Sequence, residues 1–370
     1  MEREIYGWTE RFGMRFLGRP EEFRNVIPVV EDSHAGTQTP SVVKFNRRLR
    51  GFLALAPSDR KNKGKEMLLQ NATELIERID NREFEPNEYF QLVEHGTEQL
   101  ILSTRDVLMG EKPGTREFDM LEEDMGEFAA ALSCLDPRTT DIRLLSIEYY
   151  LYNPIKYEFI FAHRPPGRIR CIRSLEDLIE YRSSSKAPYI LNQRIKIAYK
   201  LAEAVFFLHT AGFVHKNITT SSVVILSSSH SDTASAFDRN VFREAYLMGL
   251  NLIRGVHACS DPSSVVPPWV WNRDISQHLD RLRRTDGPKY VKPYDTYSLG
   301  VVLLTIGLWR TLSAAAWSRI KVETPLSQWT EQLIGLAPQI GPIVGNRYQR
   351  IVEWCLGMTR DQNLRDMDFV

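Results

Sequence analysis

Apolar side chains recur at intervals of three and four residues in several parts of the chain, which predicts helices with one buried face. The clearest stripe lies in residues 191–209 and contains Ile195, Tyr199, Ala202, Val205, Phe206 and His209. Residues 118–132 and 348–356 are expected to form further helices. The stretch 297–309 is apolar around most of its circumference, so it predicts a helix that is buried on all sides.

Short runs rich in β-branched and aromatic residues predict strands. Three such runs follow one another from Tyr89, with the sequences FQLVEH, QLILST and RDVLMGEK. Two more, at 142–152 and 157–162, come after the helix expected at 118–132. These five strands and their helix are expected to form one compact antiparallel unit, and two short strands are expected later, at 223–226 and 245–250.

The first 90 residues have a weaker pattern. Helical spacing is kept by Met67, Leu68, Ala72, Leu75, Ile76 and Ile79, which predicts a helix that ends near Asn81. The preceding stretch APSDRKNKGK, residues 56–65, is polar and contains Pro and Gly, so it predicts an exposed loop. Residues 1–90 are therefore expected to be a mostly helical extension.

The charge balance limits the classes of partner. The chain has 370 residues, with 47 Lys plus Arg and 47 Asp plus Glu, so its formal net charge is zero. A chain-wide basic field is excluded, and nucleic acid is not an expected partner. The four cysteines form no CxxC pair, which predicts reduced thiols in a cytoplasmic protein. The longest apolar run, 301–309, is shorter than the roughly 20 residues of a membrane helix, so no membrane span is expected.

Three short motifs occur in a fixed order in the second half of the chain. HKNITTSS spans residues 215–222, GLNLIR spans 249–254 and DTYSLG spans 295–300. Their order and spacing resemble the catalytic loop HRDLxxxN, the DFGLAR segment and the DxxSxG helix start of a protein kinase. The resemblance covers residues 95–370.

This resemblance implies an α+β, bilobal protein-kinase-like fold. Its small lobe, with five strands and one helix, would span residues 91–164, and its larger helical lobe would span 165–370. The segments QHLDR, YVKPYDTYSLGVVLLTIGLWRTL and RYQRIVEWCLG resemble, more narrowly, kinase-like domains of fungal proteins that carry an amino-terminal HeLo or prion-inhibition domain. GWTERFGM and NRRLRGFLAL make residues 1–90 similar to a shortened HeLo-like domain. Fungal nonself recognition and cell-death signalling are the functions that this resemblance implies.

Phosphoryl transfer needs a base, metal-binding side chains and a phosphate cradle, and most of these are replaced here. Asn217 stands at the base position, and its amide cannot accept a proton as a carboxylate does. Ser222 and Gly249 stand at the two metal-binding positions. No GxGxxG motif occurs between residues 85 and 108. The resemblance thus implies no intact catalytic residue and no metal site, and magnesium is not an expected cofactor.

Lys112 stands where the small-lobe lysine of a kinase reaches the nucleotide phosphates. Glu123 or Glu127, on the following helix, is the expected partner of this lysine. A surface lysine in a charged loop is the alternative with equal weight, so ATP as a ligand is left open.

Four further residues have structural roles by the same resemblance. His215 is expected to pack in the core and to form, with Leu250, part of a hydrophobic column between the lobes. Lys216 replaces an arginine that pairs with a phosphorylated segment in active kinases, and solvation is its simpler role. Asp295 is expected to cap the amino terminus of its helix and to hold the backbone of the loop at His215.

The sequence therefore predicts a catalytically impaired kinase-like signalling scaffold or switch that acts on a protein partner, rather than an enzyme. The alternative is a divergent, active Ser/Thr-type protein kinase that binds ATP and recruits other carboxylates, such as Asp238 or Asp261, to hold metal.

Overall fold

The computed structural model describes most of the chain between residues 48 and 358. The described residues are 48–49, 51–70, 72–80, 90–95, 98–107, 112–135, 142–183, 191–227, 245–255, 275–282, 290–312 and 326–358. All of them fall in one compact unit, Ser41–Arg360. Helices and small antiparallel sheets alternate along this unit, so the chain is an α+β protein. Asp238 and Asp261 lie outside the described residues.

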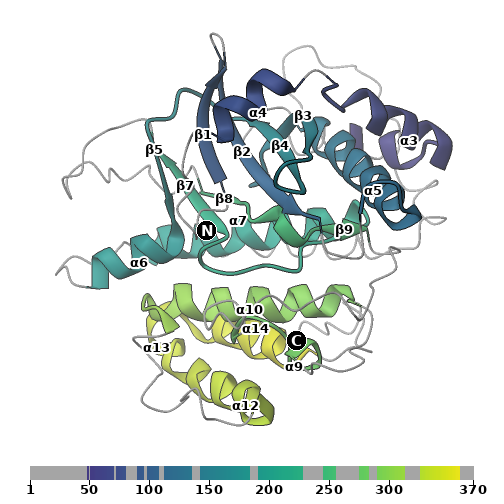
Figure 1. Ribbon diagram of the computed structural model, residues 1–370. Coiled ribbons are helices and arrows are strands. Elements are labelled where there is room, and N and C mark those ends of the chain that lie inside the picture. Colours follow the sequence, from purple (N-terminus) through teal and green to yellow (C-terminus); the bar gives the residue numbers. More distant parts are fainter. Residues whose placement is uncertain are drawn as a thin grey trace, which may run out of the picture. The chain divides into compact units, whose positions relative to one another are not determined.

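An antiparallel sheet is built from β1 (Phe90–His95), β2 (Glu98–Asp106), β3 (Ser146–Asn153) and β4 (Glu158–Arg164), in the order β1-β2-β4-β3 (Figure 1). Helix α5 (Arg116–Ser133) lies between β2 and β3 in the sequence and packs against β3. The prediction of a separate strand at RDVLMGEK is wrong at its start, because Arg105 and Asp106 continue β2 and pair with Phe159 and Glu158. In the described residues this sheet has four strands, not the expected five.

Two helices that precede the sheet in sequence belong to the same unit. The predicted loop at 56–65 is wrong, because α3 (Pro57–Glu66) is a helix. Pro57 opens it, and Lys63 and Lys65 in its last turn suit the helix dipole. The next helix, α4 (Thr73–Asp80), begins later than predicted and buries Leu75 and Ile79 against the sheet strands. Residues 57–70 and 72–80 thus belong to the same compact unit as the sheet.

Two smaller sheets and two helices follow. One sheet has the order β5-β7-β8, and the other pairs β6 with β9; their bounds are β5 (Cys171–Ser174), β6 (Phe213–Val214), β7 (Val223–Ser227), β8 (Ala245–Leu247) and β9 (Arg254–Gly255). The helices are α6 (Leu175–Ser183) and α7 (Leu191–Thr210). Ile101 of β2 shares a buried cluster with Val224, Leu226, Tyr246 and Met248, so apolar packing joins the first sheet to the second.

Helix α10 (Lys292–Leu308) is the most deeply buried helix of the described chain. Every residue from Tyr294 to Gly307 is buried, which confirms the prediction of a helix without an exposed face. It packs against α7 and α14 (Asn346–Leu356), and the remaining helical elements are η3 (Leu250–Leu252), α9 (Leu279–Leu282), α12 (Leu326–Leu336), η4 (Ala337–Gln339) and α13 (Gly341–Val344) (Figure 1). None of the helices described by the structure combines the length and apolar character needed to cross a membrane.

Candidate functional site

Asp295 lies in the first turn of α10, at the end of the helix that faces the 215–222 loop. The sequence KPYD places it there, because Pro293 favours a helix start and Val291 is the N-cap residue in extended conformation. The expectation that Asp295 caps the helix is therefore wrong. Its side chain is fully buried and accepts hydrogen bonds from other segments.

Four donors surround the Asp295 carboxylate. Oδ2 accepts from the backbone N–H of His215 at 2.7 Å and from His209 Nε2 at 3.0 Å. Oδ1 accepts from the backbone N–H of Lys216 at 2.9 Å and from the Tyr290 hydroxyl at 2.7 Å. The hold on the loop backbone that was expected of Asp295 is thus present. Burial acts to raise the pKa of Asp295, but the hydrogen bond and charge of His209 and the backbone N–H of His215 bring it below its usual value.

His215 is fully buried, and both ring nitrogens are occupied. Nε2 donates to the carbonyl oxygen of Met248 at 2.8 Å, and Nδ1 accepts from the backbone N–H of Asn217 at 3.2 Å. This pair of contacts fits the neutral ring with its hydrogen on Nε2. Burial lowers the pKa of His215, which Asp295 partly opposes. The ring therefore joins the backbone of its own loop to Met248, and it is not placed to take a proton from a bound molecule.

Lys216 adopts a left-handed backbone conformation, with φ of 68°, which is uncommon for a residue other than glycine. Asp295 holds its N–H, and Gln277 Nε2 donates to its carbonyl oxygen at 3.1 Å. Its Nζ lies 5.5 Å from the centroid of the Tyr290 ring. Burial, together with the charges of Arg281 and Arg105, lowers the pKa of Lys216 to about 7. The side chain of Lys216 is partly exposed, so it keeps some contact with solvent, as was expected of this lysine.

Asn217, Ser222 and Gly249, which the resemblance aligns with catalytic positions, come together in space. A Cβ atom on Gly249 would lie 2.7 Å from Ser222 Cβ and 3.5 Å from Asn217 Nδ2. Gly249 has φ of 78°, so both its conformation and the lack of space select glycine. Asn217 and Ser222 have no exposed surface.

The Ser222 hydroxyl is committed to a turn with Thr219. It donates to the Thr219 carbonyl at 2.9 Å and accepts from the Thr219 N–H at 2.9 Å, while the Thr219 hydroxyl accepts from the Ser222 N–H at 3.1 Å. These bonds fix the loop from within. Ser222 therefore serves the loop's own structure, at a position where the resemblance would place a metal ligand.

The nucleotide-binding candidates are not brought together. Lys112 is exposed, and its backbone carbonyl accepts from the Thr115 hydroxyl at 2.7 Å at the start of α5. Glu123 pairs with Lys61 of α3 at 2.6 Å, and Glu127 is partly buried on the same helix. Among the described residues, neither glutamate forms an ion pair with Lys112. The role of Lys112 at a nucleotide stays a prediction.

Arg105, which the sequence analysis did not select, is the buried cation of this region. It is 1% exposed, and its Nε donates to the carbonyl oxygen of Ile253 at 3.4 Å. Burial lowers its pKa to about 10, against the charges of Asp106 and Asp124. Leu250, which is 1% exposed, begins η3, and η3 packs against β2. The alternation of side chains along a strand could have indicated this burial, because Ile101, Ser103 and Arg105 fall on one face of β2.

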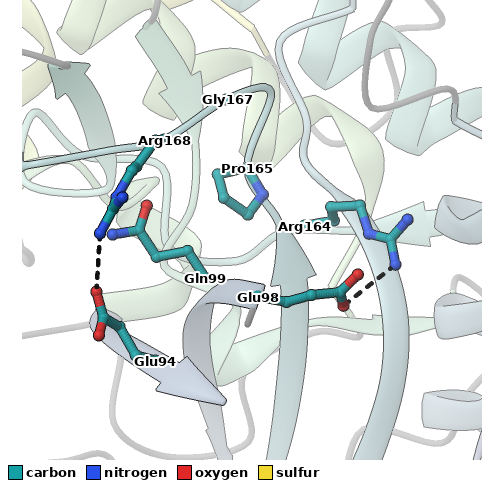
Figure 2. A pocket seen from close by; sticks show the side chains of 7 residues that line it. All are labelled: Glu94, Glu98, Gln99, Arg164, Pro165, Gly167 and Arg168. Atoms are coloured by element: carbon teal, nitrogen blue, oxygen red, sulfur yellow. Dashed lines mark hydrogen bonds and ion pairs between the residues drawn. The ribbon is translucent and has the colours of Figure 1, made fainter. Parts of the chain in front are cut away.

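A surface cavity of about 560 Å³ lies at the β1–β2 turn and the chain after β4. Figure 2 shows Arg164 and Arg168 each directed toward a glutamate on its wall. Arg168 pairs with Glu94 at 3.8 Å and Arg164 with Glu98 at 3.5 Å, so the lining charges balance. The Gln99 amide closes one side through two bonds to the Ile169 backbone. The described lining thus carries two arginines and two glutamates, whose formal charges cancel.

No protein-family model and no curated protein sequence matches the chain. In the described ranges, no group of three or more His, Cys, Asp or Glu side chains is arranged to hold a metal ion. The buried loop around Asp295 is therefore interpreted from its own geometry. That geometry joins residues 209–222, 248–253 and 290–295 through hydrogen bonds and offers no carboxylate at Asn217, Ser222 or Gly249.

Asp295→Asn is expected to lower the free energy of unfolding by about 3–5 kcal/mol, the size expected when one member of a buried charged network is removed. Whichever oxygen becomes an amide nitrogen, that nitrogen faces two hydrogen-bond donors. Urea unfolding measures the loss, with Asp119→Asn on the exposed face of α5 as the control. Equal unfolding midpoints for the two variants would contradict the role of Asp295.

Lys216→Met is expected to reduce the pH dependence of stability. In the folded chain the pKa of Lys216 is about 7, below the ordinary lysine value of 10.5, so between these values the unfolded chain binds more protons. Stability therefore rises with pH in this window, and the variant should show a smaller rise between pH 7 and about pH 9.5. Urea unfolding at the two pH values measures it, with Lys63→Met as the surface control. Identical slopes for wild type and Lys216→Met would disprove the burial of this charge.

Proposed function

We propose that this chain is a protein-kinase-like domain that does not transfer phosphate and that serves as a signalling scaffold or switch for a protein partner. The order of its elements supports the kinase-like part of the proposal. An antiparallel sheet with one helix inserted between its strands comes first, and a mainly helical region built on the buried α10 follows. The three motifs that carry the resemblance meet around Asp295.

One observation carries the non-catalytic part of the proposal. The base and metal positions converge, yet they are filled by Asn217, Ser222 and Gly249, and a side chain on Gly249 would collide with Ser222. Phosphoryl transfer depends on positioned carboxylates and hard anionic metal ligands. A single substitution at Gly249 would not restore the ligand, because space and backbone conformation both oppose it.

The strand where the resemblance places the phosphate cover supports the same proposal. Phe90 and Leu92 of β1 pack, together with Ile172, against the buried cluster that contains Ile101 and Leu226. Bulky side chains thus occupy a strand whose glycines would approach phosphates in a kinase. We propose that this packing takes the place of a nucleotide in joining the first two sheets.

The cellular setting is part of the proposal. Three described cysteines, Cys134, Cys171 and Cys355, are free thiols, which agrees with a reducing compartment such as the cytoplasm. Fungal nonself recognition or cell-death signalling is the setting that the resemblance favours. The HeLo-like character of residues 1–90 and the partner protein remain proposals.

Thermal unfolding with millimolar ATP, with and without magnesium, tests the proposed function. We expect no magnesium-dependent shift, whereas a ligand at about 100 times its dissociation constant would add about 2.7 kcal/mol. Magnesium-dependent stabilisation that disappears in Asp238→Asn or Asp261→Asn would instead support the divergent active kinase. Stabilisation that disappears in Lys112→Ala but not in those two would place a nucleotide at Lys112 and contradict the packed site.

A further inference from the structure

Helix α3 crosses α5 at unusually short range, through glycine on both helices. A Cβ atom on Gly64 would lie 2.7 Å from the backbone carbon of Gly126, and one on Gly126 would lie 3.1 Å from the Gly64 backbone. Backbone atoms cannot rotate away as a flexible side chain can. The crossing therefore accepts only glycine at its centre without a shift of one helix.

Side chains of opposite charge also connect α3 and α5 where they cross. Lys61 of α3 forms an ion pair with Glu123 of α5 at 2.6 Å. The hydrogen bond and charge of Glu123 raise the pKa of Lys61, with smaller contributions from Glu127 and Asp124. The basic side of α3 thus faces the acidic side of α5.

The chain after α3 is attached to the sheet. Leu69 N–H donates to the Tyr150 carbonyl at 2.8 Å, and Tyr150 N–H donates to the Met67 carbonyl at 2.9 Å, so residues 67–69 add a short parallel pairing to β3. The Tyr150 hydroxyl also lies 3.0 Å from the position of a Cβ atom on Gly126. The helix and the pairing together hold α5 from the side.

On its inner side, α5 contacts the segment that leads to the buried loop. Phe128 packs edge-on against Phe213 of β6, at 5.1 Å between ring centroids, and α5 packs against β9. Ile253, the residue before β9, is held through its carbonyl oxygen by Arg105 of β2. Strand β9 then pairs with β6, directly before His215.

We propose that residues 57–69 form a strap that fixes α5 and, through the packing of α5 on β9, the 249–255 segment, so that release of the strap loosens the buried loop. This inference rests on the contacts alone and does not require the kinase-like assignment. The domain would then have two states. In one, contact of α3 with α5 holds the buried loop rigid, and in the other, loss of that contact lets the loop move.

Gly64→Ala in the full chain tests the strap, because helix propensity and the crossing predict opposite signs. Alanine favours a helix over glycine, so propensity alone predicts slower amide exchange. The strap predicts severalfold faster exchange in α5 and in residues 250–255. Gly335→Ala in α12 is the matched control, because no atom lies within 4 Å of its added Cβ. Unchanged or slower exchange in α5 of Gly64→Ala overturns the proposal.

Charge reversal provides a second test that does not depend on packing. Lys61→Glu and Glu123→Lys should each speed exchange in α5, and the double reversal should restore it at least in part. If both single charge variants exchange at the wild-type rate, the Lys61–Glu123 ion pair does not hold α3 on α5. Faster exchange in α5 of Gly64→Ala with unchanged exchange at residues 250–255 would contradict the link through β9.

Discussion

A carboxylate without access to water is stable only when both of its oxygens receive hydrogen bonds, and Asp295 receives four. Two come from the backbone of a loop 79 and 80 residues earlier in the chain. One comes from His209 at the end of α7, and one comes from Tyr290 before α10. This single side chain therefore joins two helices and the 215–222 loop in the buried interior.

The rest of the loop is arranged around this anchor. The His215 ring donates a hydrogen bond to the carbonyl oxygen of Met248. The next residue, the left-handed Gly249, lets the backbone approach Ser222 closely. Each of these residues is used in holding the backbone. The proposed scaffold function needs this anchor and no carboxylate at Asn217, Ser222 or Gly249, because a rigid surface for a partner does not depend on phosphoryl transfer.

The spacing of apolar residues predicted much of the fold, but it predicted less of the candidate site. The apolar circumference of α10 and the stripe of α7 have no competing interpretation, so these helices follow from sequence. Helix α3 does not, because it buries only Gly64 and its stability comes from a crossing with α5 that no local pattern reveals. The anchoring role of Asp295 followed from its motif. Arg105 was missed because its burial depends on segments about 150 residues away.

If Asp295 is the anchor, the loop at His215 should open as rarely as the buried core does. Amide exchange of the His215 and Lys216 N–H groups in the wild-type chain measures this directly. If Asp295 anchors them, both amides exchange only when the whole unit unfolds, so the free energy from exchange equals that from urea unfolding. Exchange of these two amides at the rate of exposed loops, while amides of α10 stay protected, would contradict the claim.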